Sequence, residues 1–152
     1  MSLKLKIPPP VIGLVCALIM WLISRVFDSF DFDFPSRKLI ALGLFCLALS
    51  IDFLALLKFK SLKTTINPIK PEDSSSLVDS GVYKYTRNPM YLGLLIILFS
   101  WGLYLGNFIS MLLLPIFVWY ITVFQIIAEE EILENIFNEK YNQYKQKVRR
   151  WI

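Results

Sequence analysis

Residues 81–93 read GVYKYTRNPMYLG, and this stretch decides the fold because a polar cluster runs directly into a long apolar segment. Pro89 stands at the junction, where proline suits the first turn of a helix because its missing N–H has no intrahelical partner there. Asn88 is a good N-cap, since its side-chain oxygen can accept from a first-turn amide. A helix N-terminus beside Arg87 is also a natural anion site. The stretch therefore predicts a helix that begins at a membrane face, either as a simple cap or as half of a ligand site.

The composition is that of an integral membrane protein. Hydrophobic residues make up 56% of the 152 residues and the mean hydropathy is +0.56, against roughly 45–50% hydrophobic residues in soluble domains. The absence of histidine excludes a histidine general base, a Ser-His-Asp triad and histidine-ligated metals. Both cysteines lie in apolar runs without a CxxC pattern, which predicts small buried hydrophobic residues and no metal site. The net charge of +4 indicates membrane topology and no nucleic-acid partner.

Four apolar runs predict four transmembrane helices, at about residues 11–27, 39–57, 90–105 and 109–128. Each approaches the roughly 20 residues that cross a bilayer core. The last two are separated only by residues 106–108, so they must form an antiparallel hairpin. The expected fold class is all-α: one integral membrane domain, residues 1–152, with four transmembrane helices, a C-terminal helical hairpin and a cytoplasmic amphipathic tail helix.

The tail, residues 129–152, is polar but periodic. Its apolar residues recur at steps of four and three, which places them on one helical face: Leu133, Phe137, Tyr141, Tyr144, Val148 and Trp151. This pattern predicts an amphipathic helix that lies on anionic headgroups through its basic end. With four spans, the basic residues of the N-terminus, the 58–88 segment and the tail fall on one side of the membrane. The positive-inside rule then places both termini in the cytoplasm.

Two acidic features allow more than one interpretation. Asp52 lies near the end of the second apolar run, where a carboxylate by default indicates a functional or inward-facing position. Snorkelling toward Lys58 or neighbouring water explains it equally well. In the loop 28–38, aspartate alternates with phenylalanine. That alternation predicts an interfacial loop, because it lacks the converging ligands that a calcium site needs.

The hairpin brings two charged clusters to the same membrane face. Residues 87–91 begin the third helix and residues 129–131 end the fourth, so the clusters should lie within about 10 Å of each other given ordinary helix spacing. The expected pocket has a cation and amide donors on one wall, carboxylates on another and tyrosines around it. Such a pocket suits a zwitterionic, aromatic cofactor beside an apolar substrate that arrives from the bilayer.

Two motifs in order resemble those of a membrane enzyme family. The pattern G-x-Y-x-x-x-R-H/N-P-x-Y-x-G is met by residues 81–93, and E-E-x-x-L-x-x-x-F-x-x-x-Y-x-x-Y by residues 129–144. The preceding stretch TTINPIKPEDSSSLVDSG, residues 64–81, is similar to the same segment of bacterial members. The chain thus resembles the isoprenylcysteine carboxyl methyltransferase and phospholipid methyltransferase family of small integral membrane methyltransferases. A bacterial inner membrane is the location that this implies.

The resemblance implies S-adenosylmethionine as the methyl donor, bound by the region 64–152 at the cytoplasmic face. It also implies a lipophilic or lipid substrate, methylated on a carboxylate oxygen or on a lipid amine. Carried over by motif, the cofactor-binding residues are Leu77, Val78, Tyr83, Asn88, Pro89, Tyr91 and Glu129. Arg87 is expected to help bind the methionine carboxylate and Glu129 its ammonium, by charge-assisted hydrogen bonds. Glu130 is the expected general base should the nucleophile be an amine.

Two residues depart from the pattern of the isoprenylcysteine enzymes. Asn88 stands where they have histidine, so a hydrogen-bonding group is kept and a protonatable one is lost. Gln125 stands four residues before the glutamate pair, where they carry an arginine that holds the substrate carboxylate. Gln125 is therefore the expected substrate-binding residue, but a neutral amide is a poor partner for a carboxylate beside lipid. This argues against prenylcysteine as the substrate.

Two other functions fit parts of the sequence. Membrane sterol reductases, which use a nicotinamide cofactor, resemble this family in their C-terminal half, although this chain is short for one. A non-enzymatic four-helix membrane protein would also need helix caps and cytoplasmic basic residues. Neither alternative accounts for the two linked motifs as well as a methyltransferase does, and the oligomeric state is left open.

Overall fold

A computed structural model describes residues 5–62, 65 and 71–152, and the regular structure of this part is helical. The long apolar helices are α1 (Pro9–Val26), α2 (Arg37–Leu62) and α3 (Pro89–Leu105). A fourth apolar stretch is built from α4 (Phe108–Met111), α5 (Leu113–Ile121), the π-helical segment η4 (Thr122–Ile126) and α6 (Ile127–Phe137). Short 3-10 turns and a last helix complete the fold: η1 (Asp28–Phe30), η2 (Pro71–Asp73), η3 (Gly81–Lys84) and α7 (Glu139–Lys147).

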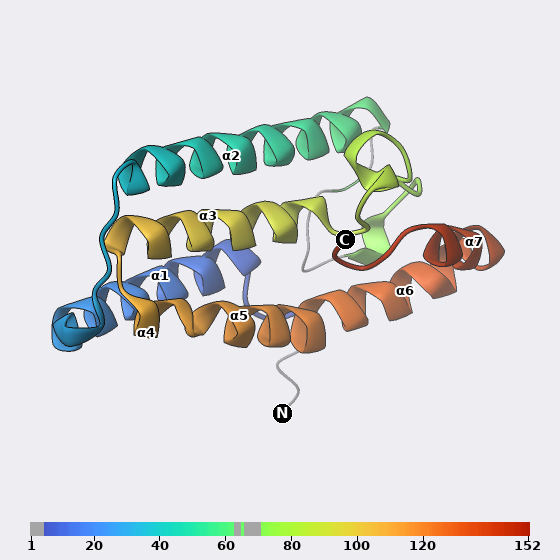
Figure 1. Cartoon of the computed structure of the whole chain (residues 1–152). Coiled ribbons are helices and arrows are strands. Elements are labelled where there is room, and N and C mark those ends of the chain that lie inside the picture. Colours follow the sequence, from blue (N-terminus) through green and yellow to red (C-terminus); the bar gives the residue numbers. More distant parts are fainter. Residues whose placement is uncertain (1–4, 63–64, 66–70) are drawn as a thin grey trace.

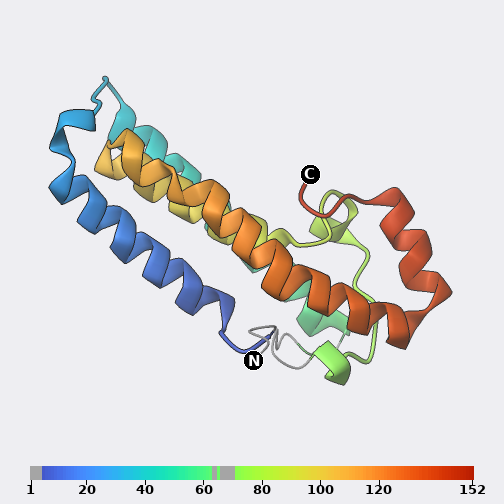
Figure 2. The same ribbon diagram turned by 90° about the horizontal axis from the view of Figure 1, so that it is seen from below.

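Helix α3 occupies the centre of the bundle. Helix α2 packs along one side of it, and α1 and α5 lie on the other side, as Figures 1 and 2 show from two directions. Helix α7, η3 and the C-terminus gather at the end of the bundle where α2 ends and α3 begins. One end of the molecule therefore holds segments from both halves of the sequence.

The all-α prediction is confirmed for the described residues. Three helices are long and apolar enough to cross a membrane, Pro9–Val26, Arg37–Leu62 and Phe108–Phe137, while the apolar α3 has 17 residues. The second and fourth helices run further than the predicted ends at residues 57 and 128. Hydropathy marks where a helix leaves the apolar phase, whereas its hydrogen bonds continue into the polar segment, so both helices extend beyond the predicted spans.

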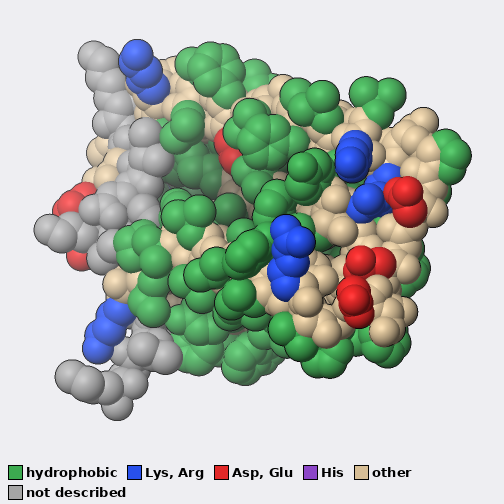
Figure 3. All heavy atoms as spheres, turned by 90° about the vertical axis from the view of Figure 1, so that its left-hand side faces the viewer, with side chains coloured by type: hydrophobic (Ala, Val, Ile, Leu, Met, Phe, Trp, Pro, Cys, Tyr) green, Lys and Arg blue, Asp and Glu red, His purple; other side chains and the backbone are tan. Residues whose placement is uncertain are grey.

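Small residues line the face of α2 that meets α3. Ala41, Ala48 and Ala55 recur every seven residues and are almost fully buried. Side chains of this size let two helix backbones approach closely, and Ser100 Oγ on α3 donates to the Ala41 carbonyl oxygen at 2.7 Å. The large apolar side chains of α2 point outward, as expected where the surroundings are lipid. Figure 3 views the end of the bundle that carries the 28–38 loop, where lysine, arginine and acidic side chains are scattered among hydrophobic ones.

Arg37, a residue outside the hairpin, holds the turn that joins α3 to α4. Gly106 ends α3 with a φ of 70°, the left-handed conformation that favours glycine. Arg37, the first residue of α2, donates from Nη1 to the carbonyl oxygens of Leu103 and Tyr104, both at 2.9 Å. A cation at these carbonyls satisfies acceptors that the end of a helix leaves free. The start of α2 is thereby fixed to the end of α3.

Asn107 joins three segments at the same end of the bundle. The residue is fully buried. Its Nδ2 donates to the Phe27 carbonyl oxygen at 2.7 Å and to Asp31 Oδ1 at 2.8 Å. Its Oδ1 accepts from the backbone N–H of Ser110 at 2.9 Å, which caps α4. One amide thus connects the end of α1, the 28–38 loop and the start of the fourth apolar stretch.

The tail is not the single helix that its periodicity predicts. It breaks at Asn138, which has a φ of 47°, a value that asparagine tolerates better than most residues. The chain turns back there, and Tyr141, Tyr144 and Val148 pack against Val78 and Tyr83. The apolar face that was expected to lie on headgroups is covered by protein. Periodicity reports that a face is apolar but does not say what covers it.

Replacing Asn107 by alanine should destabilise the fold, because the buried Ser110 amide would lose its side-chain acceptor and the Phe27 carbonyl would keep only the Phe30 amide as donor. A buried unsatisfied polar group costs about 1–3 kcal/mol, so the midpoint of thermal unfolding, followed by circular dichroism in detergent, should fall by several degrees. Asn142→Ala, on the exposed face of α7, is the matched control and should leave the midpoint unchanged. Equal midpoints for both variants would contradict this role for Asn107.

Candidate functional site

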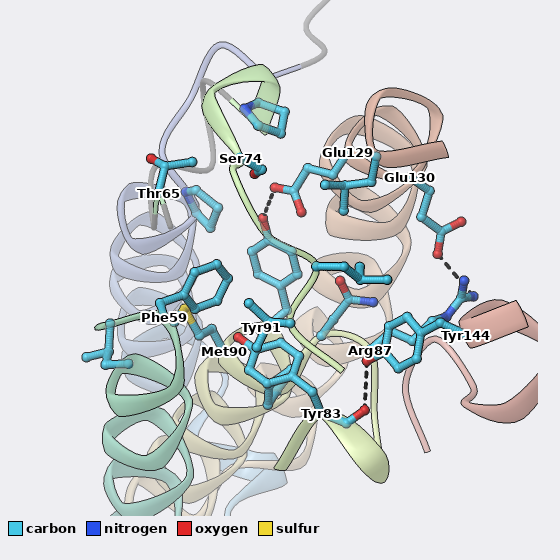
Figure 4. Close-up of a pocket in the computed structure, with 18 of the residues that line it drawn as sticks. Phe59, Thr65, Ser74, Tyr83, Arg87, Met90, Tyr91, Glu129, Glu130 and Tyr144 are labelled. Carbon is cyan, nitrogen blue, oxygen red and sulfur yellow. Dashed lines mark hydrogen bonds and ion pairs between the residues drawn. The ribbon is translucent and has the colours of Figure 1, made fainter. Parts of the chain in front are cut away.

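A cavity of about 430 Å³ lies at the end of the bundle where α2 ends and α3 begins. Its walls come from α1, α2, the 71–78 segment, η3, the start of α3, α6 and α7. Figure 4 shows the side chains that converge on it. The volume lies within the roughly 300–1,000 Å³ of pockets that bind small organic ligands.

The start of α3 forms one wall. Pro89 is its first residue, as predicted. The Asn88 side chain does not cap the helix, so that expectation is wrong: Nδ2 donates instead to the Arg150 carbonyl oxygen at 2.9 Å. The backbone N–H of Arg87 also donates to the tail, to the Arg149 carbonyl oxygen at 3.0 Å. The Asn88 side chain, which was expected to cap α3, therefore binds the returning C-terminal segment.

Glu129 and Tyr91 join the two sequence motifs directly. Tyr91 is on the first turn of α3 and Glu129 is on α6, and the Tyr91 hydroxyl donates to Glu129 Oε1. Figure 4 shows this pair with the carboxylate beside Ser74. Both residues line the cavity. The predicted meeting of the two helix ends is therefore present in the fold.

Glu130 is held by two arginines. Its Oε1 lies 3.1 Å from Arg87 Nη2, and Arg150 donates to both of its oxygens, from Nε at 3.0 Å and from Nη2 at 2.7 Å. A bidentate guanidinium–carboxylate pair is among the strong hydrogen bonds of proteins. The side chain of Glu130 is 10% exposed, so this carboxylate is buried and neutralised. The carboxylate that was expected to serve as general base is thus ion-paired with two arginines.

Tyr83 forms the wall next to α2. Its ring meets Phe59 edge to face at 5.7 Å between centroids, and its carbonyl oxygen accepts from the Tyr144 hydroxyl at 2.7 Å. Burial raises the pKa of Tyr83 well above its usual range, so the side chain is a neutral phenol at any working pH. An aromatic face of this kind attracts cations.

The remaining predicted residues divide between the cavity and its surroundings. Leu77 and Val78 line the cavity, together with Ser74 and Ser76. Gln125 does not: it lies in the π-helical segment, is 1% exposed and donates from Nε2 to the Ile7 carbonyl oxygen at 2.7 Å. Its amide fixes the segment before α1, which local sequence could not reveal. The expectation that Gln125 contacts a substrate is not met in this cavity.

Several lining residues were not among the predicted site residues. Tyr141 and Tyr144 belong to the second motif, but the motif alone assigns them no role, because they reach the cavity only where the tail turns back. Five others come from α2 and α3: Asp52, Leu56, Phe59, Met90 and Leu94. The carboxylate of Asp52 within an apolar run was the sequence feature that could have indicated that α2 lines the cavity. Arg150 carries no local signal, because only the folded tail brings it to Glu130.

The cavity is acidic. Asp52, Glu129, Glu130 and Arg87 are the charged residues among its described lining, and the one guanidinium is paired with Glu130. Arg87 Nε and Nη1 are buried without a hydrogen-bond partner in the described part of the chain. The site thus offers two carboxylates without a cationic partner and, beside them, guanidinium donors that are not fully used.

Sequence comparison relates the chain to known proteins. The sequence model of the family described as phospholipid methyltransferase matches residues 36–140. A protein-S-isoprenylcysteine O-methyltransferase of Schizosaccharomyces pombe is 33% identical over 124 residues, 80% of this chain and 52% of that protein. The Arabidopsis thaliana protein-S-isoprenylcysteine O-methyltransferase B is 34% identical over 85 residues, 56% of this chain and 43% of that protein.

A shorter relative is matched along its whole length. An uncharacterized protein of Haemophilus influenzae is 52% identical over 63 residues, 41% of this chain and 100% of that protein. The two named methyltransferases are matched over only about half of their own length or less. The family model, by contrast, covers well over half of this chain and includes both walls that carry Tyr91 and Glu129. The chain therefore belongs to the phospholipid methyltransferase family, and protein-S-isoprenylcysteine O-methyltransferases are among its relatives.

Proposed function

We propose that this protein is an S-adenosylmethionine-dependent methyltransferase that acts on a lipophilic substrate at the cytoplasmic face of a membrane. The observation that carries the proposal is the hydrogen bond between Tyr91 and Glu129, which brings the two family motifs to one cavity. Membership of the family supports the class of reaction. The names of the relatives supply the two substrate types to be compared, a carboxylate of a prenylated protein and a phospholipid headgroup.

The residues around the cavity fit the proposed cofactor. S-adenosylmethionine supplies an electrophilic methyl group on a sulfonium centre. Glu129 is a buried carboxylate whose described partner is a phenol, so it has the charge to hold the amino acid's ammonium. The unused Nε and Nη1 donors of Arg87 suit its carboxylate. The Tyr83 face would attract the sulfonium, and Leu77, Val78 and Pro89 would provide apolar contact.

The proposed topology places the reaction at the boundary between membrane and cytoplasm. Three helices meet the length and apolarity needed to cross a bilayer. We propose that α3, at 17 residues, is the fourth span, because the lower limit for a spanning helix is about 17 residues. With both termini in the cytoplasm, as the basic residues favour, the cavity faces inward. The chain would then be a single methyltransferase domain of a bacterial inner membrane.

The two substrate types place different demands on this chain. A carboxylate nucleophile needs no base, whereas a lipid ammonium has to lose a proton before it can react. Glu130 was the expected base, but its oxygens bind Arg87 and Arg150. We therefore assign Glu130 a positioning role: it holds Arg87 at the cavity and the C-terminal segment against α3.

Isothermal titration calorimetry on the purified full-length protein tests the proposed cofactor. S-adenosylmethionine should bind, because the cavity offers groups for its ammonium and its carboxylate, whereas NADPH should not. Binding of NADPH without S-adenosylmethionine would favour the reductase alternative. Binding of neither, by protein with intact helical circular dichroism, would favour a non-enzymatic role and refute the proposal.

Glu129→Ala and Tyr83→Ala should each weaken S-adenosylmethionine binding. The first removes the partner of the ammonium, a charge-assisted hydrogen bond that contributes about 1.5–3 kcal/mol, or roughly tenfold or more in Kd. The second removes the aromatic face, and a desolvated cation–π contact contributes about 2 kcal/mol. Calorimetry gives the affinities, and equal expression with equal circular dichroism checks folding. Glu131→Gln, an exposed neighbour outside the cavity lining, is the control. Wild-type affinity in both alanine variants would refute the site assignment.

Glu130→Gln separates a positioning role from a base role. Removing the carboxylate leaves two arginines without their anion, and breaking a buried ion pair from one side costs about 3–5 kcal/mol. The thermal unfolding midpoint should therefore fall and S-adenosylmethionine binding should weaken. A base would behave differently: methyl transfer would be lost while stability and cofactor affinity stayed at wild-type levels. That second pattern would overturn the positioning role.

A further inference from the structure

Asp52 is the deepest charged residue of the cavity lining along α2. Asp52, Leu56 and Phe59 are spaced to lie on one helical face, and all three line the cavity. The residue lies ten positions before the end of α2 at Leu62, which is about 15 Å along a helix that rises 1.5 Å per residue. The structure describes no ion pair between Asp52 and Lys58, which lies six positions, about 9 Å, further along α2.

The Asp52 carboxylate lies against Gly93, and one of its oxygens has no hydrogen-bond partner in the described part of the chain. A Cβ at Gly93 on α3 would overlap its oxygens, so the absence of a side chain there makes room for them. Its Oδ1 is buried and has no hydrogen-bond partner within the described residues. A buried anion that nothing satisfies is costly, and in a membrane-spanning helix such a group marks a functional position by default.

The surroundings of Asp52 indicate where its partner comes from. Leu49 and Phe53, its neighbours on α2, are exposed apolar side chains that face lipid in a membrane-spanning helix, and Leu56 lines the cavity while partly exposed. Met90 and Leu94 on α3 line the same part of the cavity. In Figure 4 the apolar pair Phe59 and Met90 lies on the opposite side of the cavity from Arg87 and Glu130. The place suits the polar group of a molecule whose remainder is apolar.

The charge of the cavity decides whether that polar group is an amine or a carboxylate. Glu130 is neutralised by arginines, so Asp52 and Glu129 remain without a cationic partner among the described lining residues. Opposite charges attract strongly and like charges repel strongly where the dielectric constant is low. With Glu129 assigned to the cofactor, the charge of Asp52 is left for the second ligand. A carboxylate ligand would add a further anion beside it.

We propose that Asp52 binds the protonated amine of a lipophilic substrate and accepts the proton that this amine must lose before it takes the methyl group, so that the second ligand of this cavity is a membrane amine and not a prenylated carboxylate. The proposal rests on the proposed function for the identity of the reaction, but the binding of an amine by Asp52 can be measured without it. Asp52 is then the residue that determines which of the two substrate types the cavity takes.

The test is calorimetric titration of the purified full-length protein with dodecylamine and with dodecanoic acid, which share one chain and differ in charge. Wild-type protein should bind the amine more tightly than the acid, without added cofactor. Asp52→Asn keeps the shape that fits Gly93 and should weaken amine binding roughly tenfold. Asp73→Asn, exposed and outside the cavity lining, corrects for amine that adsorbs to the detergent or to the surface.

Three results would overturn the proposal. They are equal amine affinity in Asp52→Asn and wild type, tighter binding of dodecanoic acid than of dodecylamine by the wild type, and weaker S-adenosylmethionine binding in Asp52→Asn. The last would assign Asp52 to the cofactor. Failure of the wild type to bind S-adenosylmethionine would refute the proposed function alone, because the amine titration contains no cofactor. The comparison of amine and acid in the wild type decides the question even if the variant does not fold.

Discussion

The architecture of the site depends on one carboxylate between two guanidinium groups. Glu130 on α6 binds Arg87, just before α3, and Arg150, near the end of the chain. Three segments that are distant in sequence therefore meet at one buried charge. Since each ion is costly to bury alone, none of the three can leave without leaving the others uncompensated. The cavity wall opposite α2 keeps its shape because this junction holds it.

The same junction explains why the tail turns back. Asn138 allows the reversal, and two kinds of contact then secure it. Tyr141, Tyr144 and Val148 bury their apolar surface against the segment before α3, while Arg150 reaches Glu130 and its carbonyl oxygen accepts from Asn88. Hydrophobic burial supplies the main driving force. The polar contacts fix the register of the tail on the helix start.

Sequence reasoning succeeded where one local rule governed the structure. The apolar runs gave the helices, the Arg-Asn-Pro stretch gave the start of α3, and the short connection gave the hairpin that places Glu129 near Tyr91. Prediction failed where a residue's partner is distant. Asn88 has the right chemistry for a cap but bonds to the tail, and Gln125 occupies a motif position but bonds to Ile7. Neither partner can be inferred from spacing, because each depends on how separate segments pack.

The outward face of α2 has a consequence for measurement. Its large apolar side chains are exposed, so in the proposed topology the apolar side of the cavity adjoins hydrocarbon while the opposite side adjoins the aqueous phase. A ligand that reaches the apolar side does so by two-dimensional diffusion, and its effective concentration is its mole fraction in the membrane. Adding inert lipid at constant total ligand then lowers occupancy, whereas changing the aqueous volume does not. Saturation of the cavity therefore depends on the concentration of ligand in the membrane and not on its concentration in the aqueous solution.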